Sequence, residues 1–241
     1  MVQLEPEGWD QPKDILVILA HPDDPEFFCG ATLARWIENG HRISYCLFTR
    51  GDKGGNEDLI DPISISNHRE AEQKSAAEVL GIGDVRFLNF PDGYLESTLE
   101  ARKSIVREIR TIRPEVVVTC DPTNIYFRGN RLNHPDHLAA GKIVLEAIYP
   151  AAGNPLYFPE LISGEGLQPH TIEEAWVSLP EQENVIIDVT PYWEKKLKAL
   201  HLHKSQIGEI TAFDKRMRER HTEDSSLENP RYEEKFRRII F

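Results

Sequence analysis

The chain has 241 residues, of which 40% are hydrophobic and 28% charged, and its formal net charge is -12. This composition is ordinary for a globular protein with a sizeable core, so we expect one domain over residues 1–241. The acidic charge argues against binding of nucleic acid or of an anionic membrane surface. No run reaches the ~20 apolar residues of a membrane span, and the N-terminus lacks the features of a signal peptide. We therefore expect a cytoplasmic protein without a transmembrane segment.

After an irregular leader that we expect to pack through Trp9, the chain alternates between apolar runs and amphipathic segments. The apolar runs are rich in branched residues, which is typical of strands buried on both faces of a parallel sheet. Strands are predicted over 15–20, 42–48, 85–88 and 115–120, and helices over 28–39, 67–80, 99–113 and 138–148. This order predicts an α/β fold with a Rossmann-like, doubly wound, mostly parallel sheet, helices on both faces, and a core over about residues 14–150.

Residues 151–241 are richer in proline and glycine at their start, which indicates a C-terminal cap region rather than a separate domain. Two further strands are predicted over 175–179 and 185–188, and helices over 191–203 and 209–220. The basic and aromatic tail 232–241 is interpreted as a docking helix. The chain has three cysteines without CxxC spacing, which we expect to be buried thiols.

Two polar motifs follow the first and fourth predicted strands. The first strand ends in His21-Pro22-Asp23-Asp24, and a long loop after the fourth strand leads into His134-Pro135-Asp136-His137 at a helix start. In the commonest doubly wound order these two strands are neighbours at the switch point, where ligands bind outside the carboxyl ends of the strands. The two motifs are therefore expected to face each other.

Together the motifs contain the ligand set of a catalytic metal site. His21, Asp24 and His137 can supply two nitrogen ligands and one oxygen ligand and leave a coordination position open, as in catalytic zinc sites. Asp23 is then left beside the metal, placed to act as general base on water that the metal activates. We expect Zn²⁺, although Fe²⁺ or another divalent ion accepts the same ligands.

The second motif also offers a side chain that could act on the substrate of a metal-activated water. His134 lies one helical turn before His137, so it can stabilise an oxyanion or protonate a leaving amine, with Asp136 available to orient it. Each motif taken alone is also compatible with a simple helix cap. Their coincidence on adjacent strand exits disfavours that interpretation, because the ligand set is complete only when the two are combined.

This architecture is also compatible with other functions. Two histidines and one carboxylate also form the facial triad of non-haem iron oxygenases, but an oxygenase has no need of a base such as Asp23. A dinucleotide-binding dehydrogenase needs GxGxxG in the first turn, where this chain has carboxylates. A non-catalytic sugar-binding protein would not explain Asp23. The remaining alternative is a metal-dependent amidase that uses the same site to cleave an amide conjugate.

Several segments resemble the PIG-L/LmbE family of metal-dependent N-acetylglucosaminyl deacetylases. They are AHPDDPEFFCGATLARW, TRGDKGG, HREAEQKSAAEVLG, FPDG, HPDH and, more weakly, KALHLHKSQ, which carries His203. The resemblance implies the metal ligands and catalytic residues given above, and it adds Arg69 and Asp92 as contacts to the sugar. Some family deacetylases have a tyrosine two residues before HPDH to polarise the substrate carbonyl, whereas this chain has Leu132.

The loop before the second motif is the predicted specificity loop. It carries Tyr126, Phe127, Arg128 and Arg131. Aromatic faces suit stacking on a sugar ring, and arginines suit a phosphate or carboxylate. The expected partner is therefore a small N-acylated sugar or conjugate. The sequence is also compatible with a homo-oligomer.

Overall fold

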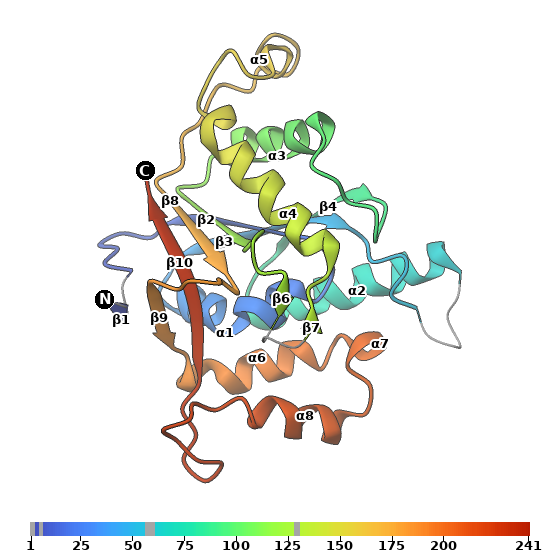
Figure 1. Cartoon of the computed structure of the whole chain (residues 1–241). Helices are drawn as coiled ribbons and strands as arrows, with labels where there is room; N and C mark the ends of the chain where they lie inside the picture. Colours follow the sequence, from blue (N-terminus) through green and yellow to red (C-terminus); the bar gives the residue numbers. More distant parts are fainter. Residues whose placement is uncertain (1–2, 5–6, 56–60, 128–130) are drawn as a thin grey trace.

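The computed structural model describes residues 3–4, 7–55, 61–127 and 131–241 (Figure 1). An eight-stranded sheet has the order β1-β9-β10-β8-β5-β2-β3-β4. Its strands are β1 Gln3–Leu4, β2 Asp14–Leu19, β3 Arg42–Thr49, β4 Asp84–Phe90, β5 Val116–Cys120, β8 Glu174–Ser178, β9 Val185–Asp188 and β10 Glu233–Ile240. β10 pairs antiparallel with both β8 and β9, and the other pairs are parallel. The sheet is thus mostly parallel, as predicted.

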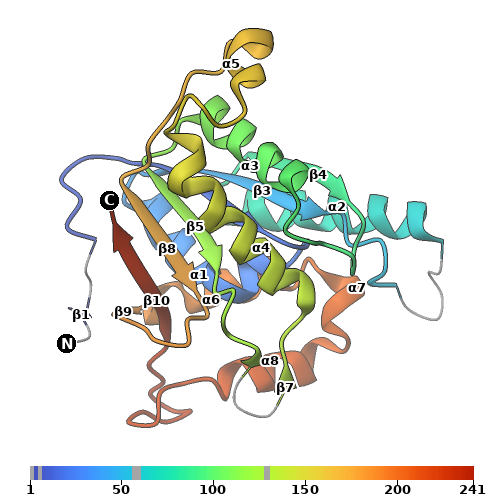
Figure 2. The ribbon, with the colours of Figure 1, turned by 45° about the horizontal axis from the view of Figure 1, so that its top comes forward.

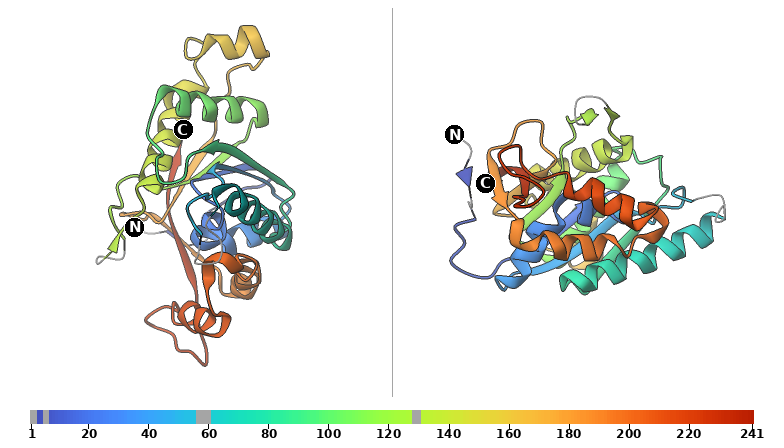
Figure 3. Two further views of the ribbon diagram at one scale, coloured as in Figure 1. Left: turned by 90° about the vertical axis from the view of Figure 1, so that its right-hand side faces the viewer. Right: turned by 90° about the horizontal axis from the view of Figure 1, so that it is seen from below.

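Helices cover both faces of the sheet (Figures 1 and 3). α1 Asp24–Glu38, α2 Pro62–Leu80 and α6 Trp193–Leu200 pack together on one face, and α3 Leu99–Ile112 packs with α4 Pro135–Glu146 on the other. The remaining elements are α5 Pro159–Glu165, α7 Lys204–Ile207, α8 Ile210–Arg218, a π-helical turn Ala147–Ala152, a 3-10 turn Thr190–Tyr192 and the hairpin strands β6 Tyr126–Phe127 and β7 Arg131–Leu132. The doubly wound α/β fold is confirmed.

The C-terminal region contributes to the sheet as well as covering it. It supplies β8, β9 and β10, together with α6, α7 and α8. The prediction of a docking helix over 232–241 was wrong, because Glu233–Ile240 is a strand. Glu234 and Phe236 are buried whereas Lys235 and Arg237 are exposed, and this alternation is the signature of a strand.

The core confirms two smaller predictions. Trp9 packs against Trp36 and Trp176, with ring centroids 5.2 and 5.7 Å away, so the leader is anchored as expected. Cys29, Cys46 and Cys120 are free, buried thiols. Within the described part of the chain, no helix combines the length and the apolar character needed to cross a membrane.

The strand order places the two polar motifs together. β2 pairs directly with β5, in the register Ile15↔Val116 to Val17↔Val118, so both strands end at the same edge of the sheet. His21 follows β2 at this edge, and the chain leaves β5 through the hairpin β6–β7 before α4 begins at Pro135 (Figure 2). The apolar runs therefore determine where the motifs meet.

Candidate active site

The turn between β2 and α1 presents the first motif. Asp23 precedes the helix with φ 90°, a left-handed backbone conformation, and Asp24 is the first helical residue. The Asp24 carboxylate accepts the backbone N–H of His21 at 2.8 Å, and Pro25 follows where a helix tolerates proline. The neighbouring carboxylates thus have different contacts, since that of Asp24 turns back to His21 whereas that of Asp23 lies 3.5 Å from Arg69 of α2.

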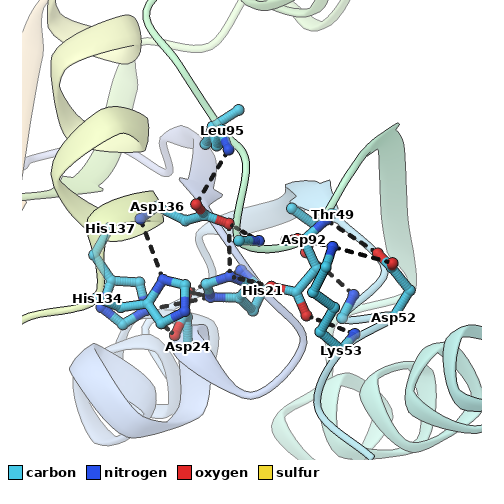
Figure 4. Close-up of polar contacts among 12 residues, drawn as sticks. His21, Asp24, Thr49, Asp52, Lys53, Asp92, Leu95, His134, Asp136 and His137 are labelled. Atoms are coloured by element: carbon cyan, nitrogen blue, oxygen red, sulfur yellow. Dashed lines mark hydrogen bonds and ion pairs between the residues drawn. The ribbon is translucent and has the colours of Figure 1, made fainter. Parts of the chain in front are cut away.

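Three donor groups converge on one point beside this turn (Figure 4). His21 Nδ1 lies 3.3 Å from His137 Nε2 and 3.4 Å from Asp24 Oδ2, and His137 Nε2 lies 3.1 Å from Asp24 Oδ1. Ligands ~2.0–2.1 Å from a tetrahedral ion lie about 3.3 Å from one another. The three residues therefore fit the coordination of one divalent ion.

The other nitrogen of His21 faces two buried carboxylates. His21 Nε2 lies 3.1 Å from Asp92 Oδ1 and 3.2 Å from Asp136 Oδ2. Burial alone would lower the pKa of His21, but its hydrogen bonds with Asp136, Asp24 and Asp92 raise that pKa well above the ordinary value. Carboxylates on the far nitrogen of a metal-binding histidine fix the ring and make it a stronger ligand.

His21, Asp92 and Asp136 also lie close enough to form a metal group of their own. The carboxylate oxygens on this side already accept backbone N–H groups, from Lys53 to Asp92 at 2.9 Å and from Gly93 and Leu95 to Asp136 at 2.7 and 3.1 Å. All three residues are buried. The side that includes His137 is the one next to exposed groups, so it suits an ion that must meet a substrate.

The structure corrects the predicted role of Asp136. Its carboxylate contacts His21 rather than the ring of His134, although Asp136 lies only two residues after His134. His134 instead caps α4, where its Nδ1 accepts the backbone N–H of Asp136 at 3.2 Å. Desolvation and the nearby rings of His21 and His137 lower the pKa of His134. The neutral ring therefore carries its proton on Nε2, on an exposed residue whose ring centroid lies 4.6 Å from that of His21.

Asp23 is paired with an arginine from α2. Arg69 Nη2 lies 3.5 Å from Asp23 Oδ2 and donates to the carbonyl of Pro22 at 2.8 Å, while Nη1 donates to the carbonyl of Gly51 at 3.1 Å. A Cβ atom at Gly51 would collide with this guanidinium, which explains the glycine in the loop. Burial, reinforced by Asp24 and opposed by Arg69, raises the pKa of Asp23 to about 6.

Two predicted sugar contacts therefore lie beneath the site surface. Arg69 and Asp92 are each 5% exposed, and their polar atoms bind the loops and His21. Arg131 and Tyr126 are exposed on the hairpin, and Leu132 is 78% exposed. Arg128 lies outside the described residues, as does the tip of the predicted specificity loop.

Sequence reasoning missed Asn133, which orients the other histidine. Asn133 Oδ1 lies 2.9 Å from His137 Nδ1, and Asn133 Nδ2 donates to the carbonyl of Asn124 at 2.9 Å. Its position immediately before HPDH, one helical turn from His137, was the available signal.

The family model described as GlcNAc-PI de-N-acetylase matches residues 16–148. The chain belongs to the PIG-L family. It is 33% identical over 203 residues to a diacetylchitobiose deacetylase of Thermococcus kodakarensis, which covers 84% of this chain and 73% of that protein. It is also 34% identical over 179 residues to a 1D-myo-inositol 2-acetamido-2-deoxy-alpha-D-glucopyranoside deacetylase of Kineococcus radiotolerans, covering 61% of this chain and 48% of the relative. The resemblance to the PIG-L/LmbE family is thereby confirmed.

Solved structures agree with this membership. The N,N'-diacetylchitobiose deacetylase of Pyrococcus horikoshii superposes with a TM-score of 0.84 at 26% identity, covering 95% of this chain and 84% of that one. A 4-carboxy-2-hydroxymuconate hydratase of Pseudomonas putida has a TM-score of 0.74 at 21% identity, covering 95% and 97%. The second likeness concerns the fold alone, and it illustrates that this PIG-L fold is not tied to one reaction.

Proposed function

We propose that this PIG-L family member removes the N-acetyl group from an N-acetylglucosamine-type sugar or conjugate, as a zinc-dependent hydrolase. The observation that carries the proposal is the convergence of His21, Asp24 and His137, with donor atoms 3.1–3.4 Å apart, beside the separate carboxylate of Asp23. The two sequence relatives named above and the Pyrococcus horikoshii protein are named as deacetylases of acetylated amino sugars, which supports the choice of substrate class.

His21, Asp24 and His137 would hold the ion. When bound, a divalent ion polarises the amide carbonyl and lowers the pKa of a coordinated water. His21 is kept in place by Asp92 and Asp136, and His137 by Asn133, so both rings are oriented before any ligand arrives. Zinc suits two imidazoles and a carboxylate, and Fe²⁺ is the alternative for the same donors.

Asp23 has the geometry of a general base. It adjoins Asp24 in the chain, and the charges of Asp24 and His21 act on its carboxylate. A pKa of about 6 leaves this carboxylate largely ionised at neutral pH yet basic enough to accept a proton. In the proposed reaction water adds to the amide carbon and its proton passes to Asp23. The C–N bond then breaks, and the same proton passes to the leaving amine, which leaves acetate and the free amino sugar.

His134 is proposed to stabilise the oxyanion. Because Nδ1 accepts the N–H of Asp136, the Nε2–H is free to point away from the helix and donate a hydrogen bond to the developing negative charge. This assignment replaces the alternative of a general acid, since a neutral imidazole of this tautomer has no spare proton to give to the amine. The proton for the amine then comes from Asp23.

The hairpin β6–β7 is proposed to select a conjugated sugar over the free sugar. Tyr126 pairs with Leu132 across the hairpin, and both side chains are exposed beside Arg131. Leu132 has no hydroxyl to offer the substrate carbonyl, so we expect binding of the second group of a conjugate to contribute more than it does in relatives with tyrosine. An amide conjugate other than an N-acetyl sugar is the alternative substrate for the same site.

The test is an assay of released amine with protein stripped of metal and reloaded with Zn²⁺ or Fe²⁺. Suitable substrates are N-acetylglucosamine, diacetylchitobiose, and the inositol and malate conjugates of N-acetylglucosamine. We expect metal-dependent release of one amine from at least one conjugate, at a higher kcat/KM than from the free sugar. His21→Ala, which lacks one of the proposed metal ligands, is the inactive control. Absence of release from every N-acetyl sugar by the reloaded wild type would refute the proposed function.

A further inference from the structure

A buried chain of hydrogen bonds leads away from Asp23 into the protein. The backbone N–H of Asp23 donates to Gln73 Oε1 at 2.7 Å, and Gln73 Nε2 donates to both oxygens of Glu26 at 3.0 and 3.1 Å. Glu26 Oε2 lies 3.1 Å from His203 Nε2. Gln73 and Glu26 are 0% exposed and His203 is 1% exposed, so water does not compete for these bonds.

The direction of the Gln73 amide is set by its partners. A carboxylate accepts hydrogen bonds and cannot donate them, so the NH₂ group of Gln73 must face Glu26. Its carbonyl oxygen is then the atom that faces Asp23. Reversing the amide would place an oxygen against Glu26 and leave the N–H of Asp23 facing a donor, and each unsatisfied buried group costs ~1–3 kcal/mol.

Gln73 and Arg69 hold the two sides of one peptide group. Arg69 Nη2 donates to the carbonyl of Pro22, and Gln73 accepts from the N–H of Asp23, which belongs to the same peptide. The two side chains are four residues apart on α2 and therefore lie on one face of that helix. The peptide they hold leads directly into Asp23, whose φ of 90° is unfavourable for a residue with a Cβ.

We propose that Gln73 is a positioning residue that, together with Arg69, clamps the Pro22–Asp23 peptide so that the Asp23 carboxylate stays beside the metal ligands and off the ion. Glu26 and His203 keep the Gln73 amide in the required direction. The inference rests on the proposed function, because it takes Asp23 as the general base. It also assigns a task to the segment around His203, where Ser205 bonds to Glu72 of α2 and so ties the C-terminal region to the same helix.

The first test is Gln73→Leu, which removes the hydrogen bonds to both Asp23 and Glu26 while keeping a similar side-chain volume. We expect kcat to fall about 10- to 100-fold, the cost of a misplacement near 1 Å, with KM within about twofold of the wild type. Metal content should remain that of the wild type, because no ligand atom is touched. Arg110→Leu is the control for lost stability, since Arg110 is also buried, at 2% exposed, but bonds to carbonyls within residues 151–158, away from the site.

A double-mutant cycle separates positioning from general damage. If Gln73 acts through Asp23, Gln73→Leu should cost little further turnover in a protein that already carries Asp23→Asn.

Exchanging the side chains of Gln73 and Glu26 is a test by recovery of turnover. Gln73→Glu alone sets two carboxylates face to face, whereas Glu26→Gln combined with Gln73→Glu restores a hydrogen-bond donor opposite an acceptor. We expect the single change to lose kcat and the double change to recover it to within about fivefold of the wild type.

Three results would overturn the inference: wild-type kcat in Gln73→Leu, loss of metal in the same variant, or additive losses in the cycle with Asp23→Asn. Failure of the swap to recover turnover in a folded, metal-replete protein would also count against it. These outcomes appear only in the variants. Failure of the proposed function itself would appear in the reloaded wild type, as absence of amide hydrolysis, or in Asp23→Asn, as normal turnover.

Discussion

Asp136→Asn tests whether the carboxylates behind His21 support metal binding. Asp136 Oδ2 accepts from Gly93 and contacts His21 Nε2, while Oδ1 accepts from Leu95. Whichever oxygen becomes an NH₂ group, one backbone N–H loses its acceptor, at a cost of ~1–3 kcal/mol in the free energy of unfolding. Removing the negative charge also makes His21 a weaker ligand, for which we expect a 10- to 100-fold rise in the metal Kd, or ~1.4–2.7 kcal/mol.

The assay is a competition titration of the metal-free protein against a coloured chelator, with urea unfolding measured on the same sample. Asp121→Asn is the matched control, because Asp121 is buried at the exit of β5 and accepts the backbone N–H groups of Thr123 and Glu181. The control should lose comparable stability and keep the wild-type Kd. An unchanged Kd in Asp136→Asn, with His21→Ala no longer binding, would refute the supporting role.

Three further predictions follow from other contacts. Asp23→Asn should keep its metal and lose turnover by ~10²–10⁴-fold, whereas Asp24→Asn should lose metal first; equal metal loss in both would contradict the assignment. Arg131→Ala should lower kcat/KM for anionic conjugates more than for free N-acetylglucosamine, and an equal effect on both would show that the hairpin does not read the conjugate. Burial alone would raise the pKa of Glu174, but hydrogen bonds from Arg238 and from the Trp9 and Trp176 indoles lower this pKa below its ordinary value. The ionised carboxylate therefore stabilises the folded protein near neutral pH. This contribution to the free energy of unfolding is lost as the pH falls through the pKa of Glu174 in the folded state. The stability gap between wild type and Glu174→Gln should therefore narrow in acid-titrated urea melts, and a gap independent of pH would contradict the argument.

The meeting of the two polar motifs could be predicted from the sequence because two simple signals coincide. The uninterrupted apolar runs of β2 and β5 predict neighbouring buried strands, and each run leads to a histidine and carboxylates at the same edge. Both signals can be recognised from the order of residue types, without knowledge of side-chain contacts. The sequence could therefore predict that the side chains of His21, Asp24 and His137 lie together, and the structure places them within 3.1–3.4 Å of one another.

The supporting contacts could not be predicted in the same way. Asp136 lies two residues after His134 in the chain, yet its carboxylate reaches His21, 115 residues away in sequence. Gln73 lies 50 residues from Asp23 in sequence, and nothing in the residue pattern of its helix distinguishes it from other polar helical residues. Such contacts depend on how α2 and α4 pack against the sheet edge, which periodicity does not specify. The strand Glu233–Ile240 was hidden for a similar reason: its sequence EEKFRRII does not alternate apolar and polar residues, because one buried position is the charged Glu234, which pairs with Lys196 of α6.

The most direct test of the account is a crystal structure of the zinc-loaded protein with anomalous scattering recorded at the zinc edge. We predict one strong peak per chain, bonded to His21 Nδ1, His137 Nε2 and the carboxylate of Asp24, with Asp23 beside it and not coordinated. A peak on the other side of His21, between Asp92 and Asp136, or no ordered peak at this edge of the sheet, would contradict the proposed metal centre.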